Sequence, residues 1–144
     1  MAHSVQITFA CDDPARMAEF WAAALGYVVQ PPPPGFDTWD DFADSVGIPE
    51  MRRNDISAVV DPDGVGPRIL FERWDAGEPN KRVHIDVNAL DGKDLSVEER
   101  ESRFAGERQR LEALGARFHR IASGMANETW MEMFDPEGNW FCVQ

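Results

Sequence analysis

The chain has 144 residues, of which 43% are hydrophobic and 28% charged, a composition typical of one globular domain rather than a disordered chain. The formal net charge of −12 argues against a nucleic-acid partner, because contacts to phosphate groups need clustered lysine and arginine. The sequence shows no apolar run long enough to cross a membrane and no signal-peptide pattern, so we expect a cytoplasmic protein without a membrane partner.

The first part of the chain predicts a strand, a helix and a second strand. Residues 4–10 alternate between apolar and polar side chains, as in a strand with one buried face. Asp13 and Pro14 are typical of a helix start, and the helix is expected to end at Gly26. The short strand "YVV" follows directly.

Residues 31–55 separate this strand from the next predicted pair. They contain a proline run and a short helix that begins at Thr38 and ends at Gly47, and we interpret them as an insertion between strands. Residues 55–74 then read as strand, turn and strand around the turn sequence "DPDG".

The second half repeats this plan. It predicts a strand at "RVHIDVNA", a helix capped by Ser96 and Glu99, and three further strands, of which the last two flank the turn "DPEG". The sequence therefore predicts an α+β fold in one domain over residues 1–144. Two βαβββ modules, at about 4–72 and 82–144, are expected to form a cupped, mixed β-sheet around a cavity.

Neighbouring side chains of a strand point to opposite faces, which sorts the residues of each strand. The apolar set expected to pack against the helices is Val5, Ile7, Phe9, Ile69, Phe71, Val83, Ile85, Val87, Met131, Met133, Phe141 and Val143. The opposite face then carries the candidates for a ligand pocket, which are Gln6, Thr8, Glu72, His84, Asp86, Trp130, Glu132, Trp140 and Cys142. A sheet with one solvated face would carry the same polar residues without any function.

Three of these side chains are candidates for chemistry. His84 can be a metal ligand or a general acid–base group, because imidazole titrates near neutral pH. Glu132 is a candidate general base if Trp130 and Trp140 make its surroundings apolar. Cys142 is either a nucleophile activated by His84 or a small buried hydrophobic residue.

The helix "DDPARMAEFWAAALGY", the strand "RVHIDV" and the ending "DPEGNWFCVQ" together resemble the vicinal oxygen chelate superfamily of glyoxalase I, bleomycin-resistance proteins and extradiol dioxygenases. Within it, "NKRVHID" is similar to the small glyoxalase-like proteins. The resemblance covers nearly the whole chain apart from residues 31–55. It implies the fold but no single activity, since the superfamily includes lyases, transferases, dioxygenases and metal-free binding proteins.

In members with a metal, the resemblance places ligands at Gln6, His84, Cys142 and either Glu72 or Leu70, between which the register does not decide. Cys142 stands where the family has glutamate, which puts the metal site in doubt. The set Gln6, Glu72 and His84 would suit zinc, nickel, iron or manganese, and a thiolate at Cys142 would favour zinc.

Two functions remain open, besides a role as a subunit or accessory interaction module. One is a small-molecule-binding protein with a degenerate metal site, whose acidic, tryptophan-lined cavity takes an amphipathic or cationic ligand. The other is a metal-dependent enzyme of the lyase or dioxygenase type, in which a divalent metal polarises vicinal oxygens of a small substrate. Small members of the superfamily often pair, so a homodimer is a further expectation.

Overall fold

The computed structural model describes residues 2–73, 83–90, 95–125, 128–136 and 138–144. The chain divides into two compact units, which we call the N-unit (Ile7–Val83) and the C-unit (Met1–Gln6 with His84–Gln144). The strands follow the order β2-β3-β4-β1-β5-β8-β7-β6 in one eight-stranded sheet, which is mixed because β5 and β8 are parallel. This confirms the α+β class and the βαβββ modules, whereas the cavity and the module boundaries stay predictions. None of the described helices combines the length and apolar composition needed to cross a membrane.

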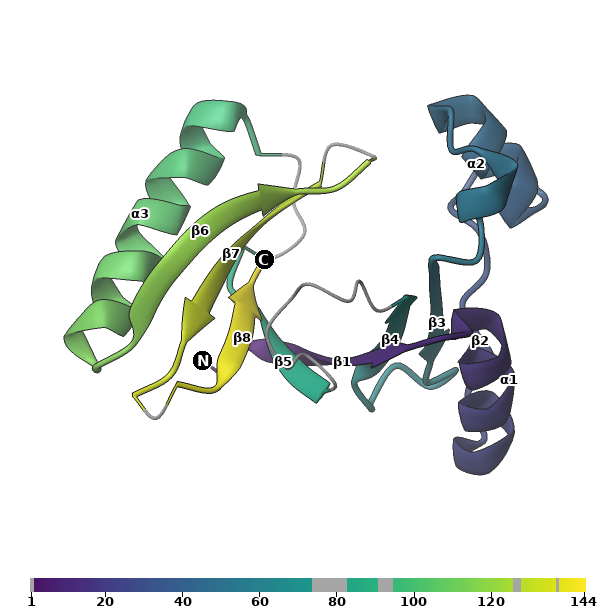
Figure 1. The fold of residues 1–144 in the computed structure, drawn as a ribbon, viewed down its shortest axis with the longest axis horizontal. Helices are drawn as coiled ribbons and strands as arrows, with labels where there is room; N and C mark the ends of the chain where they lie inside the picture. Colours follow the sequence, from purple (N-terminus) through teal and green to yellow (C-terminus); the bar gives the residue numbers. More distant parts are fainter. Residues whose placement is uncertain (1, 74–82, 91–94, 126–127, 137) are drawn as a thin grey trace. The chain divides into compact units, whose positions relative to one another are not determined.

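The N-unit follows the predicted element order (Figure 1). Its elements are β1 (Ser4–Cys11), α1 (Pro14–Leu25), β2 (Val28–Val29), α2 (Trp39–Val46), the 3-10 turn η1 (Glu50–Arg52), β3 (Ile56–Val60) and β4 (Arg68–Arg73). Helix α1 begins as predicted, because the side chain of Asp13 accepts the backbone N–H of Arg16. Asn54 also donates to Asp13 at 2.9 Å, and this bond contributes most to lowering the pKa of the Asp13 carboxyl.

The core of the N-unit lies between α1 and one face of β3 and β4. It is built from Ala18, Val59, Ile69 and Phe71, with Phe9, Met17 and Trp21 packed against it. Ile69 and Phe71 therefore occupy the packed face of β4, as predicted, and Glu72 takes the opposite parity.

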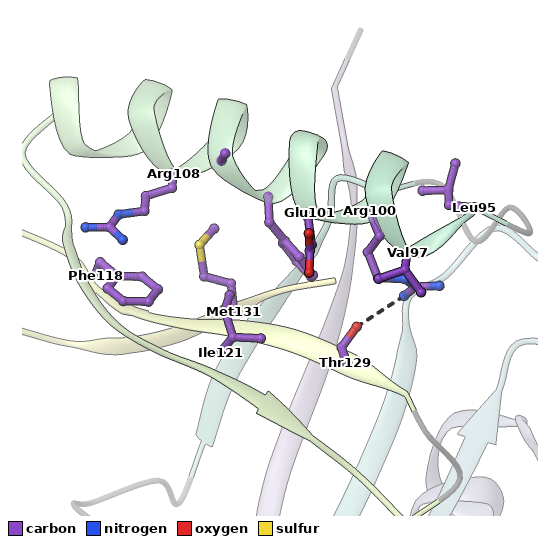
Figure 2. Close-up of a pocket in the computed structure, with 11 residues that line it drawn as sticks. Leu95, Val97, Arg100, Glu101, Arg108, Phe118, Ile121, Thr129 and Met131 are labelled. Carbon is purple, nitrogen blue, oxygen red and sulfur yellow. Dashed lines mark hydrogen bonds between the residues drawn. The ribbon is translucent and has the colours of Figure 1, made fainter.

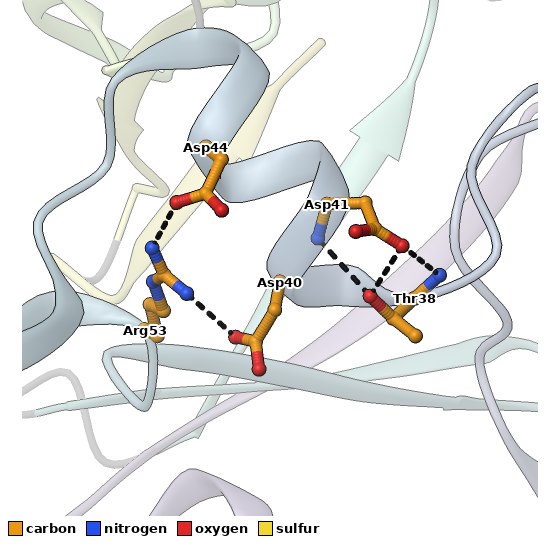
Figure 3. A network of polar contacts seen from close by, with 5 residues as sticks. All are labelled: Thr38, Asp40, Asp41, Asp44 and Arg53. Atoms are coloured by element: carbon orange, nitrogen blue, oxygen red, sulfur yellow. Dashed lines mark hydrogen bonds and ion pairs between the residues drawn. The ribbon is translucent and has the colours of Figure 1, made fainter.

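The inserted segment 31–55 folds around charged contacts (Figure 3). Thr38 and Asp41 form the predicted capping box at the start of α2. Arg53 binds the carboxylate of Asp40 at 3.1 Å and that of Asp44, which ties the loop after η1 back to α2. Phe36, Trp39 and Phe42 pack edge-on in the same segment, so both polar and aromatic contacts hold the insertion together.

The C-unit carries the second module. Its elements are β5 (Val83–Asn88), α3 (Val97–Ala113), β6 (Arg117–Ser123), β7 (Thr129–Phe134) and β8 (Trp140–Val143). Strand β8 lies between β5, to which it is parallel, and β7, to which it is antiparallel. Figure 1 shows α3 lying along one face of these strands.

The core of the C-unit fills the space between α3 and this sheet face. Its buried members are Leu90, Phe104, Met131, Met133 and Val143, and Val87, Phe118 and Phe141 pack against them. The packed parity predicted for β7 and β8 is thereby confirmed. Towards the start of α3 the core opens into a groove of about 620 Å³ (Figure 2), lined among others by Val97, Phe104, Ile121 and Met131.

Three of the expected core residues are exposed. Val5, Val83 and Ile85 are 40%, 57% and 49% exposed, so the prediction that they pack against a helix was wrong. On β5, only Val87 packs against the cluster under α3 among the described residues. Alternation assigns a residue to a face, but whether that face is covered depends on how far the neighbouring helix extends.

Candidate functional site

Polar side chains collect on the sheet face of the C-unit that points away from α3. Gln6, His84, Asp86, Glu132 and Cys142 have exposed fractions between 2% and 7%. On β7 and β8 they alternate with residues of the core under α3, so strand parity explains why they share the other face. Strand alternation predicted this set for one concave surface, and the structure gathers these five in one unit.

The strand register places three of these side chains and that of Arg120 in a row across the sheet. Asp86 on β5 pairs with Cys142 on β8, Cys142 pairs with Glu132 on β7, and Glu132 pairs with Arg120 on β6. Directly paired residues of neighbouring strands have adjacent side chains. The row therefore brings a carboxylate, a thiol, a second carboxylate and a guanidinium side by side.

One end of the row is organised by contacts among Gln6, Asp86 and His84. The side-chain amide of Gln6 donates a hydrogen bond to Oδ2 of Asp86. The other oxygen of Asp86, Oδ1, lies 3.2 Å from Nε2 of His84. The second ring nitrogen of His84, Nδ1, is buried and has no hydrogen-bond partner among the described residues. A buried polar atom of this kind calls for an explanation, such as a bound ion or water.

His84, Asp86 and Cys142 together form a group that fits a metal ion. Each offers one ligand atom, and these atoms lie within 4.8 Å of one another. Imidazole, carboxylate and thiolate are all zinc ligands. The predicted set Gln6, Glu72 and His84 shares only His84 with this group. Cys142 stands at a further ligand position that the resemblance named, and Asp86 had been assigned to the ligand pocket.

The other end of the row is a buried carboxylate with several donors. Oε2 of Glu132 lies 2.6 Å from Nε of Arg120, and Oε1 accepts a hydrogen bond from the indole Nε1 of Trp130 at 3.1 Å. Trp130 was expected to give Glu132 apolar surroundings, but its indole N–H instead binds the carboxylate. A role of Glu132 as general base stays a prediction.

An aromatic cluster lies beside the row. Trp140 is buried and packs edge-on against Phe134 and His119, with ring centroids 5.3 Å and 5.5 Å apart. Trp140 was predicted as a pocket residue from the sequence, whereas His119 and Arg120, the partner of Glu132, were not. Strict alternation along residues 117–123 gave no signal for them, because the register shifts between Phe118 and Arg120.

Thr8 and Glu72, the remaining predicted site residues, belong to the N-unit. Thr8 is 1% exposed, and Glu72 is half-buried on β4 opposite Ile56. Their predicted roles beside His84 stay predictions. The N-unit also holds the other cysteine, Cys11, whose pKa is raised chiefly by burial, with further contributions from nearby carboxylates.

Residues 6–144 match the family described as glyoxalase-like domain. Two solved structures are similar to the chain over nearly its whole length. A glyoxalase/bleomycin resistance protein/dioxygenase superfamily member from Vibrio splendidus 12B01 has a TM-score of 0.51 and 12% identity, with 99% of this chain and 97% of that chain covered. Methylmalonyl-CoA epimerase from Mycobacterium tuberculosis has a TM-score of 0.50 and 16% identity, with 98% of this chain and 84% of that chain covered. Among curated proteins no relative matches.

Proposed function

Because the chain belongs to the glyoxalase-like domain family, we propose that it binds a small molecule at the buried polar face of its C-unit. The observation that carries this proposal is the row of Asp86, Cys142 and Glu132 across β5, β8 and β7. Burying polar groups costs free energy, which Glu132 and Asp86 offset through their contacts with Arg120, Trp130 and Gln6. The row offers a ligand both hydrogen-bond acceptors and a thiol.

The ligand classes follow from the residues around the row. Trp130 and Trp140 provide aromatic surfaces, and the formal net charge of the chain is −12. Aromatic rings and carboxylates favour an amphipathic or cationic molecule. We further propose that no nucleic acid binds, that the protein is cytoplasmic, and that it pairs as a homodimer, which light scattering tests.

A metal-dependent enzyme is the second candidate, and the group of His84, Asp86 and Cys142 favours it. A divalent zinc, nickel, iron or manganese ion held there would polarise neighbouring oxygens of a lyase or dioxygenase substrate. The residues of the chain then have separate tasks. Glu132 is placed on the neighbouring strand to hold a proton of the substrate, and Arg120 orients the Glu132 carboxylate.

Tryptophan fluorescence tests the proposal with two probes. Catechol has two neighbouring oxygens, and bleomycin is a cationic molecule with aromatic rings. We expect a saturable fluorescence change with one of them in chelator-treated protein. The change should be lost in Glu132→Ala and kept in Trp39→Phe, a matched control because Trp39 lies on the inserted helix α2 of the N-unit.

The outcomes separate the two candidates. Saturation without metal supports the binding protein. Saturation with catechol only after a divalent metal is restored supports the enzyme, whereas bleomycin is used without metal because it chelates divalent ions itself. No saturation with bleomycin, and none with catechol with or without metal, would contradict the proposal.

A further inference from the structure

We propose that His84, Asp86 and Cys142 form a thiolate-containing site for zinc, in which Gln6 is a positioning residue and not a ligand. The inference rests on the site of the proposed function and specifies its chemistry. It differs from the ligand set Gln6, Glu72 and His84 that the resemblance implied. The thiol that had put a metal site in doubt becomes one of its ligands.

The spacing of the ligand atoms is the first observation that supports a zinc site. Two ligands of a tetrahedral zinc ion lie about 3.5 Å apart, given bond lengths of about 2.3 Å to sulfur and about 2.0 Å to nitrogen. The ligand atoms of His84, Asp86 and Cys142 lie within 4.8 Å of one another. This limit exceeds the zinc-bound spacing by about 1.3 Å, so the side chains would move closer together on binding. The three residues are on the adjacent strands β5 and β8, so the backbone already holds them in place.

The two ring nitrogens of His84 are the second observation. Its Nε2 lies 3.2 Å from Oδ1 of Asp86, while the buried Nδ1 has no hydrogen-bond partner among the described residues. Nε2 is thus the ring nitrogen beside Asp86, and a zinc ion shared by the two residues would take the place of this direct contact. Nδ1 would then carry the ring proton, which fixes the tautomer of the ligating imidazole.

Gln6 explains how the carboxylate is oriented. Its amide donates to Oδ2 of Asp86, which leaves Oδ1 as the oxygen nearest to His84. Partners of this kind fix the orientation of a ligand, and their loss typically costs about 10- to 100-fold in metal affinity. We therefore expect Gln6→Ala to weaken zinc binding within that range without abolishing it.

The donor set selects the metal. Thiolate and imidazole prefer zinc, whereas magnesium, calcium and manganese prefer oxygen ligands. When zinc binds, the thiol of Cys142 forms the Zn–S bond as thiolate and its proton passes to solvent. Three protein ligands leave the fourth zinc position for water or for the small molecule.

Cobalt(II) tests the thiolate ligand directly, because a thiolate bound to cobalt(II) gives a charge-transfer absorption band in the near ultraviolet. Chelator-treated protein is titrated with cobalt(II) and, separately, with zinc, and retained zinc is measured by plasma mass spectrometry. We expect the wild type to retain about one equivalent of zinc. With cobalt(II) it should show the thiolate band, and added zinc should displace the cobalt. Cys142→Ser should lose the band, whereas Cys11→Ser, the matched control on the N-unit, should keep it.

A second measurement uses only the wild-type chain, so it does not depend on how variants fold. Zinc should slow the alkylation of Cys142 by iodoacetamide, and Cys11 in the same sample should react at an unchanged rate. No zinc retained by the wild type, a thiolate band that persists in Cys142→Ser, or zinc that leaves Cys142 unprotected would each overturn the inference. If the protein binds no metal but still binds catechol or bleomycin, the proposed function stands and only the zinc site is overturned. Zinc binding without probe binding would leave only the metal site.

Discussion

The guanidinium of Arg120 and the carboxylate of Glu132 form a contact of 2.6 Å, yet 48% of the arginine side chain is exposed and only 2% of the glutamate side chain. The stability lost when the contact is removed therefore depends on which partner is left behind. An exposed guanidinium can turn to water, whereas a buried carboxylate that loses its counter-ion stays desolvated.

Arg120→Ala should accordingly destabilise the protein more than Glu132→Gln. We expect a loss of about 2–3 kcal/mol in the free energy of unfolding for Arg120→Ala and about 1 kcal/mol for Glu132→Gln. Urea unfolding followed by circular dichroism measures both. Glu112→Ala removes an ion pair to Arg108 on α3, in which both side chains are at least 40% exposed, and should cost about 0.5 kcal/mol. Equal losses of unfolding free energy in Arg120→Ala and Glu132→Gln would contradict this expected difference.

Gln6 offers a second test of the buried polar row. Gln6→Ala removes the amide that donates to Asp86 and should cost about 1.5–3 kcal/mol, the range for a hydrogen bond to a charged group. Gln6→Glu should cost more, because it places two carboxylates side by side. Gln109→Ala, at an exposed position of α3, is the control and should leave the urea midpoint unchanged.

The core of the C-unit predicts a larger effect. Met133 is fully buried in the cluster beneath α3, so Met133→Ala should lower the free energy of unfolding by about 2–5 kcal/mol. Met51 is 85% exposed, and Met51→Ala should change it by less than about 0.5 kcal/mol. Thermal unfolding of both variants checks this difference, and similar melting temperatures would argue against the burial of Met133.

Asp61 predicts a dependence of stability on pH. The backbone N–H groups of Gly66, Asp63 and Val65 donate to its carboxylate and lower its pKa in the folded state, Gly66 most strongly. Because the folded pKa lies below the unfolded value of about 3.9, the stabilisation is complete above that value and is lost as the pH falls through the folded pKa.

Asp61→Asn should therefore lower the urea midpoint at pH 7, and its difference from the wild type should shrink below about pH 4. Asp37→Asn, at an exposed position, serves as the control. A difference between wild type and Asp61→Asn that stays constant down to pH 3 would show that charge is not the cause.

Strand parity predicted the two faces of β7 and β8 correctly, because α3 covers one face of both strands. Met131, Met133 and Val143 are buried beneath the helix, and Glu132 and Cys142 take the opposite face. β7 and β8 pair with each other without a register shift, so the alternation in their sequences carries over directly to the structure.

Parity could not predict the surroundings of Glu132. Phe118 pairs with Met133 on the core face, but Arg120, two residues later, pairs with Glu132 on the other face. The register shift between them inserts one residue, His119, and reverses the alternation. A bulge of this kind has no period-2 signature in a single sequence, which is why the ion pair was missed.

The first strand has a consequence for how the protein is made. Residues Ser4 to Gln6 of β1 cluster with His84–Gln144, and the rest of β1 clusters with Ile7–Val83. Gln6 therefore leaves the ribosome long before its partner Asp86, and the C-unit is complete only when both have been synthesised. Domains with local contacts can fold as they emerge, but this pairing waits for a contact distant in sequence. The buried polar row is thus assembled late, after the N-unit has had time to form.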